Sequence, residues 1–489
     1  MAQKLVLSPV SRIEGHLSVE TKIKDSQVID AWIHGEMYRG IENILLGRKP
    51  LDAIRIVQRI CGVCHEVHGI AAARALAKIY NVQPPSNGCI LMDIILALHI
   101  VCDHILHFYQ LTLPDYVDFS VLSSYSTSDP LFKQLSKWLA LKKPLLSFKK
   151  APGDYIKEPK LVATFFAHYI EALEIIAKGG KGLAVLGSKA PFSHAIFPGG
   201  ITTTITADRL ENVKAITEDI YFFVQKAYLP DIKHLTRIYS AYFHIGNGYR
   251  NLLAYGGFSS LGEPLFKAGV LINGENAPFS VEKITEHVSY SYYEGKPRSF
   301  LEEDTCPSPK KSGAYSWIKA PRYNGHPMET GPLARVWFSK KSRDRFIALI
   351  RDLGYSEKEA FSVMGRHLAR AVETEILLEF ILNAIEKVDP SEPTIIDVNP
   401  DAQINGRDYA LSNAARGDLI HFLEVDFGRI VRYQTVMPTT WNFSPRDEND
   451  TLGPAEKALI GTPVKFKQGL IEVGRVVRSF DPCMACSVH

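Results

Sequence analysis

The sequence predicts an α+β fold that is predominantly α-helical, with a large helical core, an N-terminal β-hairpin region and additional small β segments. Polar and apolar residues alternate over the first 35 residues, helical periodicity dominates from about Pro50 onward, and short β-type runs return between Asp418 and Val436. The chain shows no clean linker. We therefore expect one interdependent unit over residues 1–489, made of a β-rich region (1–49), a helical core (50–290), a loop and β region (291–345) and a helical C-terminal region (346–489).

Local patterns predict the individual elements. Apolar residues at alternate positions predict strands over 17–23 and 28–33, with a turn between them. Ser356 and Glu359 form a capping-box pattern, and apolar residues at helical spacing continue from there. This helix should end near Asp389, because the proline that follows disfavours α geometry in the residue before it.

Three further segments have a distinct composition. The Gly-, Pro- and Tyr-rich stretch from Tyr292 to Pro332 predicts long loops and short strands, and a short helix is expected at about 471–479. The most apolar window, Ile90 to Leu113, contains aspartates and histidines, which favours a buried core helix over a membrane span.

Composition excludes some classes of protein. The 489 residues are 46% hydrophobic and 22% charged, which is ordinary for a globular protein. The net charge is +3 and no basic run is interleaved with aromatic residues, so we expect no nucleic-acid partner. No apolar run of signal-peptide length follows Met1, so we expect no targeting segment.

Four of the seven cysteines form two C-x-x-C pairs, Cys61 with Cys64 and Cys483 with Cys486. Such pairs can supply four thiolates to one metal site. The pairs are 419 positions apart (483 − 64), so the site would join the two ends of a large protein and make the C-terminal region, residues 346–489, metal-binding. A structural zinc site and a redox dithiol remain alternatives at this point. A thiolate-bound transition metal is favoured, with its identity open.

The residues around the two pairs carry a resemblance. The first pair lies in Arg59-Ile-Cys61-Gly-Val-Cys64-His-Glu-Val-His68 and the second in Asp481-Pro-Cys483-Met-Ala-Cys486-Ser-Val-His489. The chain resembles the large, catalytic subunits of nickel–iron hydrogenases, and its motif style is closest to the membrane-associated uptake branch. Five more stretches fit the same family in order: Arg12-Ile-Glu14-Gly-His16, Met37-Tyr-Arg39-Gly-Ile-Glu42, Lys319-Ala-Pro-Arg322-Tyr, Gly331-Pro-Leu-Ala-Arg335 and Pro438-Thr-Thr-Trp-Asn442.

The resemblance implies an activity and a cofactor. The expected reaction is the reversible heterolytic cleavage of H2 to protons and electrons at a nickel–iron centre. The iron would carry carbon monoxide and two cyanides. By position, Cys61 and Cys483 are the expected terminal nickel ligands, and Cys64 and Cys486 are expected to bridge nickel to iron. Cys483 also shows that the chain is not written as a selenocysteine form.

The resemblance also implies roles for residues around the metals. Arg416 matches an arginine that lies over the metals and contacts a cyanide, and Thr439 matches a hydroxyl donor to the other cyanide. Asp103 and Asp481 match carboxylates that orient that arginine. Four thiolates and two cyanides would outweigh the charge of the two metals, so buried cations and donors are needed nearby. Without the resemblance, Arg416 would be taken for a surface arginine.

Three more roles follow from the same resemblance. Glu14 is the expected acid–base group, which receives the proton from Cys483, although a lone glutamate is usually solvated. His68, about one helical turn beyond Cys64, is placed to hydrogen-bond a bridging thiolate. Glu42, the backbone carbonyl of Thr435 and His489 match a second metal site, for magnesium or iron.

Some positions depart from the family pattern. Ala415 precedes Arg416 where many relatives have proline, and His65 and Glu66 are an uncommon filling of the loop after Cys64. Met484 and Ser487 stand where relatives often have other small or aliphatic residues. None of these departures removes an expected ligand.

The remaining cysteines, Cys89, Cys102 and Cys306, are isolated, whereas a four-iron cluster ordinarily needs four thiolates. Iron–sulfur clusters are therefore expected only in a partner, the family's small subunit, in a heterodimer or a dimer of heterodimers. Because the family's export signal is on that partner, the expected location is the periplasm or the periplasmic face of the membrane, with membrane association only through partner subunits. A cytoplasmic location is the alternative.

Two other functions compete with this interpretation. Complex I contains a subunit of the same ancestry that lost the metal site, and intact retention of all four cysteines argues against it. A scaffold protein held together by a structural zinc ion would give Glu14 and Arg416 no common function. The Gly179-Gly-Lys-Gly182 stretch lacks the spacing of a nucleotide-binding loop.

Overall fold

The computed structural model of the protein describes residues 2–123, 128–130, 132–133, 137, 150–302 and 305–488. Helices make up 44% of it and strands 19%, so the predicted mixed α+β class is confirmed. The α-helices are α1 (Ile41–Leu45), α2 (Asp52–Val57), α3 (His65–Ile79), α4 (Ser86–Leu106), α6 (Pro159–Gly187), α7 (Ala207–Phe223), α8 (Leu229–Ile238), α9 (Pro332–Phe338), α10 (Lys340–Asp352), α11 (Val363–Ile385), α12 (Pro438–Asn442), α13 (Pro454–Leu459), α14 (Ile471–Ser479) and α15 (Met484–Ser487).

The strands form small antiparallel sheets built from neighbours in the sequence. Three sheets have three strands each, in the orders β1-β2-β3, β6-β7-β8 and β11-β12-β13, and β4 pairs with β5 and β9 with β10. The strands are β1 (Gln3–Leu7), β2 (Leu17–Lys24), β3 (Gln27–Gly35), β4 (Ile196–Phe197), β5 (Gly200–Ile201), β6 (Leu252–Gly257), β7 (Phe266–Ile272), β8 (Glu275–Ala277), β9 (Ile284–His287), β10 (Ala320–Tyr323), β11 (Gly406–Ala414), β12 (Gly417–Asp426) and β13 (Arg429–Val436).

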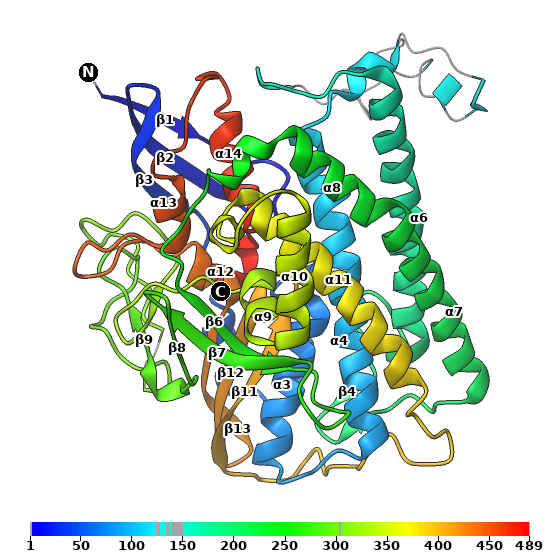
Figure 1. Cartoon of the computed structure of the whole chain (residues 1–489). Coiled ribbons are helices and arrows are strands. Elements are labelled where there is room, and N and C mark those ends of the chain that lie inside the picture. Colours follow the sequence, from blue (N-terminus) through cyan, green and yellow to red (C-terminus); the bar gives the residue numbers. More distant parts are fainter. Residues whose placement is uncertain are drawn as a thin grey trace.

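The long helices gather on one side of the molecule and the sheets on the other (Figure 1). Helix α4 lies at the centre of the helical side, in contact with α6 and α11, and α7 packs against both of those helices. Among the described residues, one helical stretch, Ser86–Asp115, is long and apolar enough to cross a membrane, and 89% of its most apolar window is buried in the structure. This burial agrees with the core helix predicted over residues 90–113.

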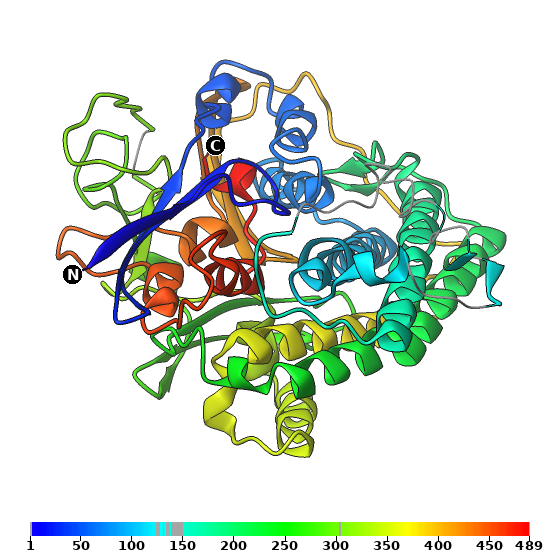
Figure 2. The ribbon, with the colours of Figure 1, turned by 90° about the horizontal axis from the view of Figure 1, so that it is seen from above.

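The two ends of the chain lie side by side. Seen from above, the N-terminal strands in blue run next to the C-terminal helices in red (Figure 2). The backbone amide of Met484 donates to the carbonyl of Glu14 at 2.9 Å, and the amide of Arg39 donates to the carbonyl of Val488 at 3.2 Å. One hydrophobic cluster contains buried residues from Val10 to Val488. The first and last regions of the chain are therefore packed into a common core.

Several predicted elements are confirmed. The hairpin of β2 and β3 pairs Leu17 with Gly35 at one end and Lys24 with Gln27 at the other. The short helix near the end is α14, with the predicted bounds. The strands predicted between 418 and 436 are β12 and β13.

Other predictions need correction. The region expected to be helical to residue 290 contains β6 to β9, because short apolar runs such as Leu252–Gly257 do not show by periodicity whether they form strands. Strand β11 was also not predicted. The capping box at Ser356 exists, but it starts only a 3-10 turn, and Ser362 caps α11 instead by accepting from the amide of Gly365. That helix ends at Ile385, a few residues before Asp389.

Candidate metal centre

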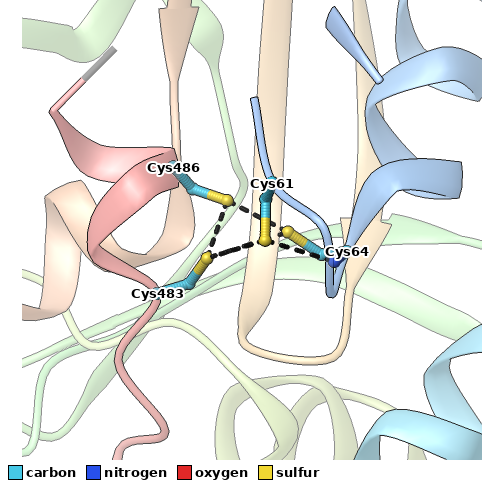
Figure 3. Close-up of side chains that lie close together, drawn as sticks. All are labelled: Cys61, Cys64, Cys483 and Cys486. Carbon is cyan, nitrogen blue, oxygen red and sulfur yellow. Dashed lines mark hydrogen bonds between the residues drawn. The ribbon is translucent and has the colours of Figure 1, made fainter. Parts of the chain in front are cut away.

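The four paired cysteines come together in one buried cluster. Their Sγ atoms all lie within 4.8 Å of one another. The Sγ of Cys483 lies 3.3 Å from that of Cys61 and 2.9 Å from that of Cys486, and the Sγ of Cys64 lies 3.0 Å from that of Cys486 (Figure 3). Each residue is at most 3% exposed. Since a metal–thiolate bond is about 2.3 Å long, sulfurs at these separations can share one or two metal ions.

The first pair is positioned by the start of helix α3. Cys64 is the residue immediately before the helix, and the Sγ of Cys61 accepts from the amides of Val63 at 3.2 Å and Cys64 at 3.4 Å. Amide donors and the positive end of a helix dipole both favour a thiolate over a thiol. Hydrogen bonds within the cluster, first of all with Cys483, lower the pKa of Cys61 well below its ordinary value.

The second pair follows a sharp turn after α14. Asp481 has a φ of 58°, which redirects the chain before Pro482. Burial raises the pKa of the Cys483 and Cys486 thiols well above the ordinary value. Buried thiols of this kind become thiolates when a bound cation offsets the loss of solvation. The donor set therefore fits a soft, multiply charged metal ion.

The N-terminal segment brings Glu14 to this cluster. Oε2 of Glu14 lies 3.2 Å from the Sγ of Cys483 and accepts from the amide of Ala485 at 2.9 Å. Gly15 makes the close approach possible: its φ is +80°, and a Cβ there would lie 2.8 Å from the Cβ of Met484. Burial, followed by the negative charge of Cys61, raises the pKa of Glu14.

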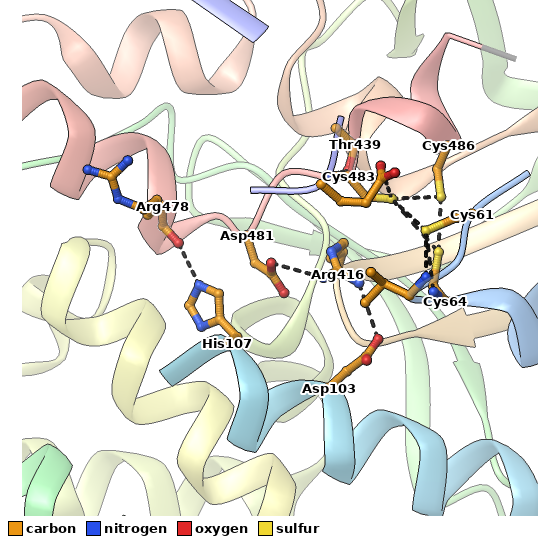
Figure 4. A network of polar contacts seen from close by, with 12 residues as sticks. Cys61, Cys64, Asp103, His107, Arg416, Thr439, Arg478, Asp481, Cys483 and Cys486 are labelled. Carbon is orange, nitrogen blue, oxygen red and sulfur yellow. Dashed lines mark hydrogen bonds and ion pairs between the residues drawn. The ribbon is translucent and has the colours of Figure 1, made fainter. Parts of the chain in front are cut away.

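Arg416 lies beside the cluster between two carboxylates (Figure 4). It occupies a two-residue loop between β11 and β12, where Ala414 pairs with Gly417. Its Nη1 donates to Oδ2 of Asp103 at 3.2 Å, and its Nη2 lies 3.1 Å from Oδ1 of Asp481. All three residues are at most 5% exposed. Burial outweighs the effect of Arg416 and raises the pKa of Asp103 to about 7.

A small cavity lies between Arg416 and the sulfurs. It borders three of the four cysteines, Cys61 being the exception, and it is lined by Cys64, Val67, His68, Ala414, Arg416, Leu419, Pro438, Thr439, Cys483 and Cys486. The hydroxyl of Thr439 accepts from the amide of Cys483 at 3.0 Å, so its own hydrogen is available for donation. Among the described residues, Nε of Arg416 has no hydrogen-bond partner. A polar group in the cavity would therefore find donors.

His68 and Glu42, two further predicted site residues, both have buried polar side chains. Nε2 of His68 is 3.3 Å from the Sγ of Cys486 and 3.6 Å from that of Cys64. The carboxylate of Glu42 is buried and accepts from the amide of Thr435 at 2.8 Å. The third predicted ligand of that second site, His489, lies outside the described residues.

Comparisons with known proteins decide between the candidate metals. A model of the nickel-dependent hydrogenase family matches residues 39–489. The chain belongs to this family. It is 35% identical to the periplasmic NiFeSe hydrogenase large subunit of Desulfomicrobium baculatum, over 99% of this chain and 95% of that protein. It is 31% identical to the hydrogenase-2 large chain of Escherichia coli (strain K12), over 100% of this chain and 97% of that protein.

A solved structure of a hydrogenase has the same fold as this chain. An H2-activated NiFeSe hydrogenase from Dm. baculatum matches with a TM-score of 0.89 and 33% identity, and the match covers 100% of both chains. The predictions of a nickel–iron hydrogenase large subunit and of an oxidoreductase acting on H2 are therefore confirmed. Membership of a nickel-dependent hydrogenase family, together with four cysteines that converge on one site, supports a nickel–iron centre in this chain.

Two motif arginines of this hydrogenase chain support the fold rather than the metals. Arg335 is fully buried and bonds Glu373 and Asp418, each at 2.8 Å. Arg322 bonds Asp447 at 2.8 Å within the sheet side of the molecule. These contacts hold the loop and β region against the β11–β12–β13 sheet and the helical side.

The sequence analysis did not single out two residues beside His68. Nδ1 of His68 lies 3.1 Å from Nε2 of His421, whose Nδ1 lies 2.7 Å from the hydroxyl of Tyr433. The only signal in the sequence is that both residues fall in the predicted β runs between 418 and 436. The unusual His65 and Glu66 form an ion pair with each other at 3.2 Å.

Proposed function

We propose that the four cysteines hold a nickel–iron pair whose iron carries carbon monoxide and two cyanides. In this proposal Cys61 and Cys483 bind nickel alone, while Cys64 and Cys486 bridge the two metals. The cavity carries the proposal, because it brings three of the four cysteines, Cys64, Cys483 and Cys486, to the same space as the polar groups of Arg416 and Thr439. Small ligands on an iron bound to the bridging sulfurs would occupy that space.

The polar groups of the cavity suit two cyanides. Arg416 offers Nε, which has no other partner among the described residues, and its charge is held in place by Asp103 and Asp481. Thr439 offers a hydroxyl on the other part of the lining. A charged donor and a neutral donor would satisfy both ligand nitrogens, and the guanidinium would offset part of the negative charge of the thiolates.

When bound, the metal pair supplies a site that polarises H2 and splits it heterolytically. The protein moves the proton. The contact between Cys483 and Glu14 makes that carboxylate the proposed first acceptor after the terminal thiolate. Glu14 is only partly buried, whereas the cysteines are fully buried, so this residue leads from the cluster toward the surface.

The second metal site is proposed to use Glu42, the carbonyl of Thr435 and His489, with magnesium or iron as the ion. The proximity of Glu42 to Thr435 supports it. The hydrogen bond from Arg39 to the carbonyl of Val488 also brings the residue before His489 close to the segment that carries Glu42.

A partner subunit completes the proposal. Cys89, Cys102 and Cys306 belong to no shared cluster among the described residues, so the chain offers no site for an iron–sulfur centre there. We propose that electrons leave through an iron–sulfur small subunit, in a heterodimer or a dimer of heterodimers. The name of the D. baculatum relative supports a periplasmic location, which the partner's export signal would provide.

The whole chain is proposed to act as one unit, since its core contains residues from both ends and the metal cluster draws two ligands from each. A relative of complex I that lost its metals would have no need for four converging thiols. A scaffold protein held together by a structural zinc ion would need neither the cavity nor Arg416.

Infrared spectroscopy of the purified complex, combined with metal analysis, tests the proposed centre. We expect nickel and iron in the cysteine cluster together with one carbon monoxide and two cyanide bands. Cys64→Ser should lose the bands, because a bridging thiolate serves both metals. The matched control, Cys89→Ser, alters a partly buried cysteine outside the cluster and should keep them. Zinc alone, with no such bands, would rule the centre out.

A further inference from the structure

A row of hydrogen-bonding side chains leads from the cluster into the β11–β12–β13 sheet. The row starts at Cys486 on α15 and passes through His68 on α3 and His421 on β12 to Tyr433 on β13. The three distances are 3.3 Å, 3.1 Å and 2.7 Å. Each of these side chains is at most 3% exposed.

The sheet fixes the far end of this row. His421 pairs with Thr435 in the β12–β13 register, and Tyr433 lies two residues away on the same face of β13. Helix α3, which carries His68, packs against β12. The positions of His421 and Tyr433 are therefore set by strand pairing and not by a loop.

The chemistry of the groups gives the row one direction. A thiolate accepts, so Nε2 of His68 must carry the hydrogen that faces Cys486. A neutral imidazole then has an acceptor at Nδ1, which requires Nε2 of His421 to donate. Nδ1 of His421 becomes an acceptor in turn, and the phenol of Tyr433 donates to it.

We propose that His421 and Tyr433 are positioning residues that hold His68 as a hydrogen-bond donor to Cys486 and thereby withdraw electron density from that sulfur. This inference rests on the proposed nickel–iron centre, in which Cys486 bridges the metals. Partners of this kind are usually carboxylates. A phenol at the end of the row orients the imidazoles without adding another negative charge to a buried cluster of thiolates.

Substitution of His421 separates this role from simple packing. His421→Leu fills the space but neither donates to His68 nor accepts from Tyr433. His421→Gln keeps an amide donor and a carbonyl acceptor. A weaker donor at Cys486 leaves the metals more electron-rich. The Leu variant should therefore shift the carbon monoxide band to lower wavenumber. It should also shift the midpoint potential of the centre to more negative values. The Gln variant should stay close to wild type, and Tyr433→Phe should shift both in the same direction by less.

The matched control is Tyr239→Phe. It removes another buried phenol, one that donates to the backbone carbonyls of Tyr116 and Asp154, and should leave bands and potential unchanged. The proposal is overturned if His421→Leu keeps wild-type bands, or if the Leu and Gln variants shift equally. The presence of the wild-type bands tests the proposed centre, whereas the inference depends on the differences among variants.

Discussion

The two sides of the thiol cluster are built from different chemistry. On one side, Glu14 reaches Cys483 from a partly buried N-terminal segment, and its carboxylate can take up a proton. On the other side, His68 reaches Cys486 from the core, and the groups behind it are an imidazole and a phenol. In the functions proposed above, one side moves protons and the other sets the electron density of the sulfurs.

Burial raises the pKa of a group on each side, with opposite consequences for proton transfer. Desolvation, followed by the Cys61 charge, raises the pKa of Glu14, so its neutral form is populated at higher pH than for a solvated glutamate. A carboxyl group whose pKa is raised in this way accepts a proton more readily than a solvated one. Burial raises the pKa of Tyr433 well above its ordinary value, which leaves the phenol a donor and unable to act as an acid.

The largest effect is expected from Glu14→Gln. Glutamine keeps the size of the side chain and a hydrogen bond to the amide of Ala485, but it cannot carry a proton. Dye-linked H2 oxidation and H/D exchange with solvent should fall by roughly 10²- to 10⁴-fold, the range typical of a positioned general base. Nickel content, the infrared bands and para/ortho H2 conversion should persist, because none of them requires a proton to leave the pocket.

The control for this variant is Glu20→Gln, which alters a partly buried glutamate on β2 that pairs with Lys4 at 2.6 Å. It should exchange at the wild-type rate. Wild-type exchange in Glu14→Gln would mean that protons leave by another route. The two sides of the cluster would then no longer differ in function.

Short motifs explain why so much of the site could be predicted from the sequence. The cysteines, Glu14, Arg416 and Thr439 each lie within a few residues of other recognisable positions. The structure brings the four cysteines into one cluster, with Arg416 and Thr439 on the adjoining cavity and Glu14 against Cys483. His421 lies 353 positions from His68, and strand periodicity gives the face of a residue but not its partner. The sequence could therefore predict His68 beside a bridging thiolate but not the two groups behind it, His421 and Tyr433.

The same limit applies to the fold. The hairpin of β2 and β3 is predictable because both strands alternate and a turn joins them. The strands β6 and β7 are short, largely apolar runs inside a chain dominated by helical periodicity. Their place in the fold depends on packing against α9, which periodicity does not reveal. At Ser356 the capping box was real, but Ser362 supplied a second cap that restarts the helix.

Arg416→Lys should have a smaller effect and should separate charge from geometry. Lysine keeps the positive charge between Asp103 and Asp481 but loses the planar set of donors. We expect the metals to remain and H2 oxidation to fall by roughly 10- to 100-fold, as for other groups that support a metal site. H/D exchange and dye reduction should fall by the same factor, because the proton route through Glu14 is intact.

Arg366→Lys is the matched control, since Arg366 is an equally buried arginine that binds Glu329 through Nε at 2.7 Å. It should reduce stability without moving the infrared bands. If Arg416→Lys lost exchange selectively, Arg416 would belong to the proton side of the cluster. The proposed contact with a cyanide would then be wrong.

The smallest effect is expected at Thr439, which contacts both sides: its oxygen accepts from the amide of Cys483, and it borders the same cavity as His68. Thr439→Val removes the hydroxyl and leaves a buried amide unpaired, which should destabilise the protein by about 1–3 kcal/mol. One cyanide band should move, and turnover should fall by less than roughly tenfold, since a neutral hydrogen bond contributes only about 0.5–1.5 kcal/mol.

Thr439→Ser keeps the hydroxyl and should restore the band. Thr374→Val, which removes a buried hydroxyl bonded to the carbonyl of Arg370, should reduce stability alone. A cyanide band that moved equally in the Ser and Val variants would show that the methyl group, and not the hydroxyl, contacts the ligand.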